Sequence, residues 1–440
     1  MLSRRQLLGW SAAGAAAAAA RSFSSGSAMS VRNASWSEVR AGFAFASTSN
    51  APIPMNAANL CPALSMVTDR VHAAAQRLDL DASFHHRLLY QQTERAALGP
   101  MLERHLGIAH KEDVALVRNT SEANSIVVNG LPLTRDDEVL LWSQNHHTNN
   151  RSWAYRAQRD GFAIRVVDLP TDPVDDTALI APFLSVLTPK TRVVSFSHIS
   201  NTSGLRLPAA ALCAAIREVR PDIYIHVDGA QSWGAAALNL AAMDCDSYAA
   251  SAHKWLAGPR ELGILYVRPA WAARMHANTI GYDYRFDYPE ADLPQTAARF
   301  ECLGQRNDAA LSGLNAALQF HLDLGPERIE ARISELGRQL REKLRQIGLT
   351  VLTPSNERYA LGVTVVDVGP SDAMSAFRSL YETRQISAAF IHEHRIVGDI
   401  ERIAADQPLP LYLRLCPHIC NDEADIERAT TAVAQIAGRA

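Results

Sequence analysis

One lysine and one aspartate are placed to do amine and acid chemistry. Lys254 lies in the run Ser-Ala-His-Lys-Trp-Leu-Ala-Gly-Pro, and Asp228 lies in the run His-Val-Asp-Gly-Ala-Gln. A lysine amine can hold an aldehyde as an imine, and a carboxylate can keep a pyridine nitrogen protonated. Pyridoxal 5'-phosphate (PLP) requires both groups, so this pair predicts PLP as the cofactor.

The elements that position this pair alternate between short apolar runs and helical stretches from Val114 onward. Continuous apolar strands joined by helical crossovers predict an α/β fold with a mostly parallel sheet, covered by helices on both faces. The predicted strands cover residues 114–117, 138–142, 163–167, 192–196, 223–227, 247–250 and 263–267. The predicted helices between them cover residues 121–129, 149–160, 176–187 and 208–219.

Polar residues follow the predicted strands one after another. In a doubly wound sheet, ligands bind outside the carboxyl ends of the strands. Each residue alone has an ordinary explanation, such as a helix cap or a surface histidine, but their order along one sheet edge indicates a cofactor site. The candidates after successive strands are Thr120 and Ser121, His146, Asn201, Asp228 with Gln231, and Ser251 with His253 and Lys254.

At these residues the chain resembles the class V aminotransferase superfamily, a group of fold type I PLP enzymes that includes cysteine desulfurases and isopenicillin N epimerase. The resemblance spans about residues 50–435 and implies a large PLP-binding domain, a small C-terminal α+β domain and a homodimer. It also implies that Lys254 is the Schiff-base lysine and that Asp228 pairs with the pyridine nitrogen. The other implied roles are the phenolic oxygen for Gln231, ring stacking for His146, the substrate carboxylate and ring for Asn201, and the phosphate for Thr120, Ser121, Ser251 and His253.

Arg414 is the predicted substrate-binding residue. The run Leu-Arg-Leu-Cys-Pro-His-Ile-Cys-Asn-Asp-Glu from Leu413 resembles the C-terminal strand and turn of the family, whose arginine binds an α-carboxylate. A guanidinium can bind a carboxylate through two parallel hydrogen bonds, which a lysine amine cannot do. The ordinary alternative for this arginine is a surface ion pair.

We expect aminotransferase-type chemistry on an amino-acid-like or peptide substrate, with Lys254 as the base for the Cα proton. An epimerase or a C–S lyase of the isopenicillin N epimerase type is the alternative, because both reactions use the same residues. Cysteine desulfurase chemistry is less favoured, since residues 388–410 contain no cysteine, although Cys416 leaves the question open. The run from Gly304 to Asn307 also departs from the Gly-Thr context in which the family often places a phosphate-binding threonine of the partner subunit. A chain that only binds PLP is a further alternative, and Lys254, Asp228 and Arg414 argue against it.

The cysteines and histidines predict no metal site. The six cysteines are scattered, which does not indicate a disulfide scaffold. The run Cys416-Pro417-His418-Ile419-Cys420 has donors at alternate positions, but no second Cys or His pair lies near it in sequence. His392 and His394 are read as loop histidines for the same reason.

The first residues predict export. Arg4 and Arg5 precede a short alanine-rich stretch and small residues suited to cleavage, so residues 1–28 resemble a twin-arginine signal. We therefore expect a periplasmic or otherwise exported protein that uses the twin-arginine machinery and has no stable membrane anchor. A disordered alanine-rich tail is the alternative.

The remaining chain divides into an N-terminal segment, a large domain and a small domain. The predicted bounds are 29–69, 70–310 and 311–440, with a long amphipathic helix after Leu311. In residues 326–347 arginines alternate with glutamates, which predicts a solvated helix face. The formal net charge of -3 and the absence of a basic stripe disfavour a nucleic-acid partner. The aromatic and charged loop 282–288 either lines the site entrance or packs on the surface.

Overall fold

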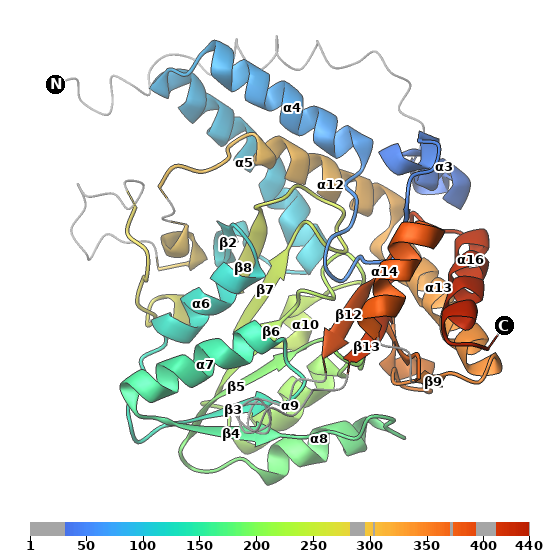
Figure 1. Cartoon of the computed structure of the whole chain (residues 1–440). Helices are drawn as coiled ribbons and strands as arrows, with labels where there is room; N and C mark the ends of the chain where they lie inside the picture. Colours follow the sequence, from blue (N-terminus) through green and yellow to red (C-terminus); the bar gives the residue numbers. More distant parts are fainter. Residues whose placement is uncertain (1–30, 282–294, 302–303, 370–372, 393–410, 440) are drawn as a thin grey trace.

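The fold is described from a computed structural model of the chain (Figure 1). It describes residues 31–281, 295–301, 304–369, 373–392 and 411–439. The predicted signal at 1–28, the loop 282–288, Cys302 and most of the cysteine-free stretch, including His394, lie outside these residues. Within the described part of the chain, no helix has both the length and the apolar character needed to cross a membrane.

The central sheet has seven strands in the order β2-β8-β7-β6-β5-β3-β4. Strand β8 runs antiparallel to its neighbours β2 and β7, and every other pair is parallel. The prediction of a mostly parallel sheet is confirmed, and each predicted strand end lies within one residue of the observed one. The strands are β2 (Val114–Val117), β3 (Glu138–Trp142), β4 (Ala163–Val167), β5 (Thr191–Ser197), β6 (Tyr224–Asp228), β7 (Ser247–Ser251) and β8 (Gly263–Val267).

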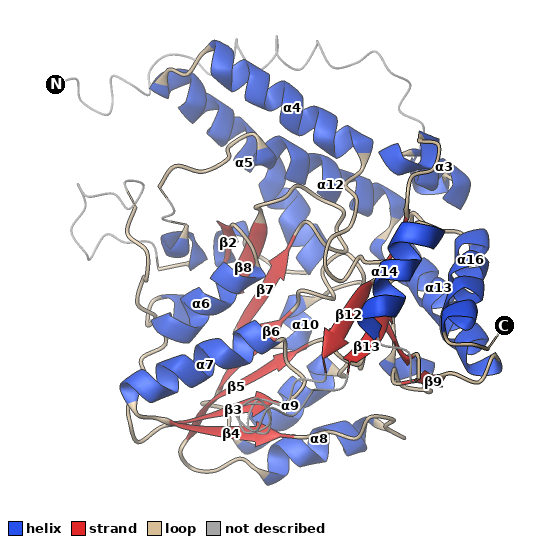
Figure 2. Ribbon diagram, viewed as in Figure 1, coloured by secondary structure: helices blue, strands red, loops and turns tan. Residues whose placement is uncertain are grey.

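Both faces of this sheet are buried, which explains the continuous apolar runs. In β3, Leu140 packs in one hydrophobic cluster, whereas its neighbours Val139 and Leu141 pack in another. The first cluster includes Leu212 of helix α9, and the second includes Ile126 of helix α6. Figure 2 shows the helices around the sheet, which are α6 (Thr120–Gly130), α7 (His147–Asp160), α8 (Asp176–Ser185), α9 (Ala209–Val219), α10 (Leu240–Met243) and α11 (Pro269–Ala272).

Three long helices pack together beside the sheet. Helix α12 contacts both α4 and α5, although it follows them by about two hundred residues of sequence (Figure 1). The long helix predicted after Leu311 ends at Leu324, because Gly325 has a φ of 92°, and the helix predicted over 326–347 is confirmed as a separate helix that starts at Pro326. The three helices are α4 (Ser65–Leu80), α5 (Phe84–Leu106) and α12 (Ala310–Leu324), and α3 (Trp36–Ala41) and α13 (Pro326–Gln346) precede and follow them in sequence.

A second, four-stranded sheet of order β12-β13-β10-β9 lies in the C-terminal part of the chain. Its strands are antiparallel, and helices α13, α14 and α16 cover it around a separate hydrophobic cluster. Ile53 and Met55 of the N-terminal segment belong to this cluster, and β1 pairs with β11. The elements are β1 (Ile53–Pro54), β9 (Thr350–Val351), β10 (Thr364–Asp367), α14 (Ala373–Arg384), β11 (Ile386–Ser387), β12 (Ala389–His392), β13 (Leu411–Leu415) and α16 (Glu423–Ile436).

The prediction of a solvated arginine face on residues 326–347 is wrong for two arginines. Arg341 is fully buried; its Nη1 donates to the carbonyl oxygen of Leu361 at 2.7 Å, and it forms an ion pair with Glu357. Arg332 is also buried. Alternating charges do not reveal this burial in sequence, because it depends on two distant segments: Arg332 contacts Asn421 and Glu423, whereas Arg341 contacts Glu357 and Leu361.

Candidate active site

Asp228 ends strand β6 and is held by a chain of buried hydrogen bonds. The amide nitrogen of Asn124 on α6 donates to Asp228 Oδ2 at 2.9 Å, and the backbone N–H of Ala230 donates to Oδ1 at 3.0 Å. Burial raises the pKa of the Asp228 carboxyl, and these two donors and Lys254 oppose the shift.

His226 continues this chain of hydrogen bonds. Its Nε2 lies 3.0 Å from Asn124 Oδ1, and its Nδ1 lies 2.7 Å from the hydroxyl of Ser247. Burial lowers the pKa of His226 to about 3, so the ring is neutral at neutral pH. Because an amide oxygen only accepts, the ring proton belongs on Nε2. A neutral histidine thus orients Asn124, which in turn orients Asp228.

Lys254 lies in a tight loop after strand β7. The backbone N–H of Ala257 donates to the Lys254 carbonyl oxygen at 2.9 Å, and the backbone N–H of Gly258 donates to the Ala252 carbonyl oxygen at 2.8 Å. Burial lowers the pKa of the Lys254 amine to about 8, while Asp228 raises it and Arg414 lowers it further. The amine therefore has a larger unprotonated fraction near neutral pH than an ordinary lysine, and this is the form that attacks a carbonyl.

Two of the predicted phosphate residues, Thr120 after strand β2 and Ser251 at the end of strand β7, are in contact. The backbone N–H of Thr120 donates to Ser251 Oγ at 2.7 Å, and the two hydroxyl oxygens lie 2.6 Å apart. This contact puts both hydroxyls at the first turn of α6, where the helix dipole favours an anion. Ser121 is exposed at the same turn. The residue that caps α6 is Asn119, so Thr120 and Ser121 are not needed as caps.

His253, next to Lys254, is half-buried. Burial lowers its pKa to about 4, with Lys254 and Arg260 adding to the shift. The ring is therefore neutral at neutral pH and can donate one hydrogen bond to a phosphate oxygen.

Gln231 is buried beside the lysine loop and is already engaged. Its amide nitrogen donates to the Ala58 carbonyl oxygen at 3.1 Å, and its Oε1 accepts from Trp255 Nε1 at 2.8 Å. One amide N–H remains for the ring oxygen that the family resemblance assigns to it. The contacts also join strand β6, the lysine loop and the N-terminal segment.

Arg414 of strand β13 is buried, and within the described part of the chain it has no carboxylate partner. Its Nη1 donates to the Asn201 carbonyl oxygen at 3.3 Å and its Nη2 to Asn56 Oδ1 at 3.4 Å, while Nε has no hydrogen-bond partner. Burial lowers the pKa of the guanidinium. A surface ion pair, the ordinary alternative for this residue, is therefore wrong. A buried cation of this kind is stabilised by an anionic ligand.

A cavity of about 390 Å³ brings three predicted residues together, namely His146, Asn201 and Arg414. His146 forms the N-cap of α7, and its Nδ1 lies 2.7 Å from Thr148 Oγ1. Asn201 Oδ1 is buried and has no hydrogen-bond partner among the described residues, so this acceptor is unused. The other lining residues are Asn56, Asn59, His147, Phe377, Ala388, Ala389, Phe390 and Ile391.

The arrangement fits PLP. Thr120, Ser251 and His253 can hold a phosphate, and Asp228 can hold the pyridine nitrogen. Lys254 carries an amine that can bind the aldehyde, and its charge interacts with those of both Asp228 and Arg414. Asn201 Oδ1 and Arg414 Nε have no hydrogen-bond partner among the described residues, which leaves an acceptor and a donor for a substrate.

Several residues of the site were missed by reasoning from sequence. Asn124 lies one helical turn after Thr120, which puts both on one face of α6, and this spacing was the available signal. Asn56 and Asn59 carry no local signal, because they reach the site from the N-terminal segment. Arg306, in the run that departs from the family pattern, donates to the carbonyl oxygen of Leu116 in its own chain.

Comparisons with known proteins agree with this geometry. The family described as Aminotransferase class-V matches residues 81–387. Isopenicillin N epimerase of Streptomyces clavuligerus is 30% identical over 381 residues, which cover 84% of this chain and 89% of the relative. A cysteine desulfurase of Salmonella typhimurium is 28% identical over 301 residues, covering 66% of this chain and 70% of the relative.

Solved structures show the same fold. A mutant of C-DES with glycine covalently linked to its PLP cofactor has a TM-score of 0.77 and 24% identity, covering 89% of this chain and 98% of that chain. The predicted α/β fold of type I PLP enzymes and the predicted cofactor are both confirmed. The chain belongs to the class V aminotransferase family of PLP-dependent enzymes.

Proposed function

We propose that this enzyme removes the amino group of an amino-acid-like substrate by transamination. The observation that carries the proposal is the Arg414 guanidinium, which is buried in the cavity wall and has no carboxylate partner among the described residues. A free α-carboxylate of the substrate satisfies this charge through charge-assisted hydrogen bonds. The carboxylate then sits beside Asn201, whose carbonyl oxygen already positions the guanidinium.

Lys254 is the proposed base for the substrate Cα proton. PLP, when bound, withdraws electrons from the bonds of the substrate Cα. With its pKa lowered to about 8, the Lys254 amine can both accept and return a proton near neutral pH. A reaction that takes and returns the proton on one face requires only this single base, which favours amino transfer.

The cavity wall suggests the kind of side chain that the substrate carries. Phe377 and Phe390 meet edge to face at 5.6 Å, and Ile391 lies beside them. Asn56 and Asn59 supply amide groups on the other part of the wall. This mixed lining suits a side chain with an apolar stem and a hydrogen-bonding end.

Epimerisation is the second candidate, and the similarity to isopenicillin N epimerase over 84% of the chain favours it. Inversion at Cα requires a proton donor on the face opposite Lys254. His146 and His147, whose rings lie 4.3 Å apart in the same cavity, are the available groups.

Desulfuration by Cys416 is disfavoured, although cysteine desulfurases are among the relatives. Burial raises the pKa of the Cys416 thiol, which lowers its thiolate fraction and hence its nucleophilicity.

One experiment separates these reactions. The purified holoenzyme is incubated with amino acids and a 2-oxo acid acceptor in D₂O, and products are followed by NMR and chiral chromatography. Transamination predicts a new 2-oxo acid and a new amino acid. Epimerisation predicts the opposite enantiomer with deuterium at Cα, and elimination predicts a sulfur-containing or unsaturated product. The transamination proposal is wrong if Cα exchanges deuterium without any oxo acid appearing.

We also propose that the enzyme acts outside the cytoplasm as a homodimer. Residues 1–28 support export, because the paired arginines and the alanine-rich stretch have the character of a twin-arginine signal. Replacing Arg4 and Arg5 by lysine is expected to keep the protein in the cytosolic fraction. Equal periplasmic amounts of both forms would contradict export by this route, and light scattering of the pure protein tests the dimer.

A further inference from the structure

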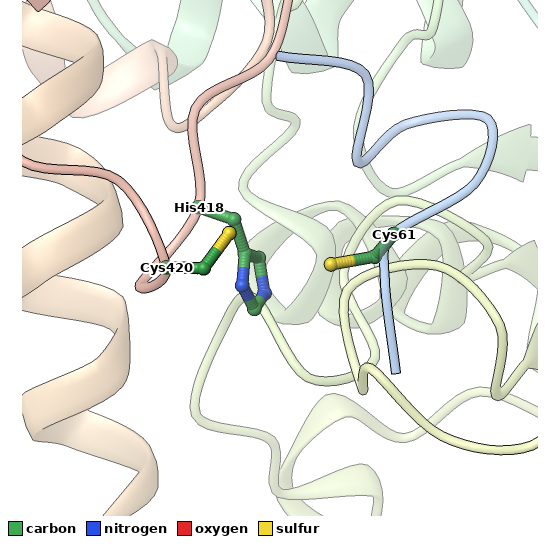
Figure 3. Close-up of side chains that lie close together, drawn as sticks. All are labelled: Cys61, His418 and Cys420. Atoms are coloured by element: carbon green, nitrogen blue, oxygen red, sulfur yellow. The ribbon is translucent and has the colours of Figure 1, made fainter. Parts of the chain in front are cut away.

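A buried cluster of two thiols and one imidazole lies outside the cofactor site. It consists of Cys61, His418 and Cys420, and one donor atom of each residue lies within 4.8 Å of those of the other two. All three side chains are buried. Figure 3 shows His418 and Cys420 on one loop, after strand β13, with the sulfur of Cys61 pointing toward the imidazole from a different segment.

The imidazole of His418 has one used nitrogen and one unused nitrogen. Its Nε2 lies 2.8 Å from the carbonyl oxygen of Trp255, so Nε2 carries the proton that this bond requires. Its Nδ1 is buried and makes no hydrogen bond of normal geometry within the described residues, while the Cys420 thiol is close enough to interact with the imidazole. A histidine that ligates a metal usually donates its other ring N–H to a carbonyl or carboxylate, which fixes the tautomer in this way. The unpaired Nδ1 is therefore prepared as a ligand.

The surrounding contacts also fix the loop that carries two of the donors. Asn421 Oδ1 accepts from the backbone N–H of His418 at 2.9 Å and lies 3.8 Å from Cys420 Sγ. Arg40 donates to the Cys420 carbonyl oxygen at 2.7 Å, which brings a positive charge, itself paired with Asp425 and Asp422, to the edge of the cluster. That charge partly offsets the negative charge that two thiolates would carry.

We propose that Cys61, His418 and Cys420 form a binding site for a thiophilic d¹⁰ metal ion, in the first place monovalent copper. Thiolate sulfur selects copper(I) and zinc among the available ions. Structural zinc is almost always bound by four ligands, whereas the described residues supply three donors here. Two sulfurs bound to one ion at about 2.3 Å lie about 4 Å apart. The cluster therefore requires shifts of less than about 1 Å to close around an ion.

The proposed ion would act on the lysine loop through the backbone. Cys61 N–H donates to the His253 carbonyl oxygen at 3.0 Å, and His418 Nε2 donates to that of Trp255. These two carbonyls flank Lys254. An ion bound here would tie the N-terminal segment and the C-terminal loop to both sides of the catalytic lysine. The site would thus stabilise the lysine loop without touching the substrate.

Metal content of the full-length protein tests the proposal. The reduced holoprotein is loaded anaerobically with copper(I), or separately with zinc(II), then desalted and analysed for metal and by X-ray absorption. We expect one copper per chain, with a shell of two sulfurs and one nitrogen. Cys61→Ala and Cys420→Ala should each lose the bound ion. Cys213→Ala, which removes a buried thiol elsewhere, should keep it.

Other results are equally decisive. Tight zinc binding that copper does not displace supports the site but overturns the assignment of copper. Metal that stays bound in both cysteine variants overturns the site, as does a Cys61–Cys420 disulfide found in the protein as isolated. If the variants fail to fold, absorption spectra of the wild-type protein without a sulfur shell overturn it. Metal content does not depend on turnover, so this test is separate from that of transamination.

Discussion

Asn124 donates a 2.9 Å hydrogen bond to the Asp228 carboxylate while its own oxygen faces the neutral ring of His226. Through this contact helix α6 controls the charge of the group predicted to hold the pyridine nitrogen. A hydrogen bond to a charged group contributes about 1.5–3 kcal/mol.

We therefore expect Asn124→Ala to weaken PLP binding by about 10- to 100-fold. Loss of the donor raises the pKa of Asp228 further, so the loss of affinity should begin at a higher pH in the variant as pH falls. Fluorescence titration of the apoprotein with PLP at several pH values measures both effects. Asn129→Ala is the control, because that amide donates to the Ser125 carbonyl of its own helix and accepts only long 3.5 Å bonds from Arg159 among the described residues, with no hydrogen bond to Asp228. Unchanged affinity at every pH would exclude this role for Asn124.

The lowered pKa of Lys254 has two measurable consequences. The rate at which the apoprotein binds PLP should increase as pH rises to about 8 and then level off. With an ordinary lysine the rate would continue to increase up to about pH 10.5. Between these values the unfolded state binds more protons than the folded state, so the stability of the apoprotein should rise with pH.

Lys254→Met separates this effect from other titrations. The variant should raise the melting temperature of the apoprotein at neutral pH, and the gain should shrink above about pH 8. Stopped-flow absorbance and calorimetry are the measurements. A gain independent of pH would show that the lysine is not the titrating group.

Arg414→Lys should selectively weaken substrates that carry a carboxylate. Lysine keeps the charge but not the two parallel hydrogen bonds. We expect kcat/KM to fall by about 10- to 100-fold for amino acids, since losing a hydrogen bond to a charged group costs about 1.5–3 kcal/mol. Steady-state kinetics with matching amines that lack the carboxylate give the control. An equal fall for both substrate classes would argue for a structural role instead.

Gly234 allows the loop after Asp228 to pack against the lysine loop. It has a φ of 89°, and a Cβ at this position would lie 2.4 Å from the backbone nitrogen of Leu256. Gly234→Ala should therefore lower the free energy of unfolding by more than the roughly 1 kcal/mol of backbone strain alone. Gly348→Ala is the matched control, because it also has a positive φ of 79° but nothing within 4 Å of its Cβ. Chemical denaturation compares them, and equal losses would contradict the steric argument.

The contacts of buried Arg341 with Glu357 and Leu361 should contribute more than the exposed ion pairs on the same helix. Arg341→Met removes the buried donor to the Leu361 carbonyl oxygen, which costs about 1–3 kcal/mol. Arg338 is paired with Glu335 and Glu342 at the surface, so Arg338→Met should lower the free energy of unfolding by less than about 1 kcal/mol. Urea denaturation of both variants measures the difference. Similar losses would mean that burial of Arg341 contributes little.

Much of the cofactor side could be predicted because it depends on order along the chain. Parallel strands bring their carboxyl ends to one edge, so Thr120, Asp228 and Ser251 could be grouped from strand positions alone. The antiparallel direction of β8 could not be predicted, because its apolar run reads the same in either direction. The role of His226 was also hidden, since a histidine inside a strand gives no sign of its partner.

Groupings between distant segments could not be predicted. Cys61 approaches Cys420 because the N-terminal segment runs beside the chain that follows β13, where Asn56 pairs with Cys416. The expectation of no metal donors considered neighbours in sequence, and our copper proposal departs from it for that reason. Domain bounds, export and the homodimer stay predictions.

Because β8 lies between β2 and β7, the central sheet cannot be completed during translation until β8 has been made. Strand β2 has no place in the sheet until residues 263–267 have left the ribosome, and the bond between Thr120 and Ser251 spans 131 residues. Such long-range pairing forms late in folding. A nascent chain should therefore be unable to retain PLP until nearly two thirds of the chain has been translated. Binding of PLP would then indicate that the sheet of the large domain is complete.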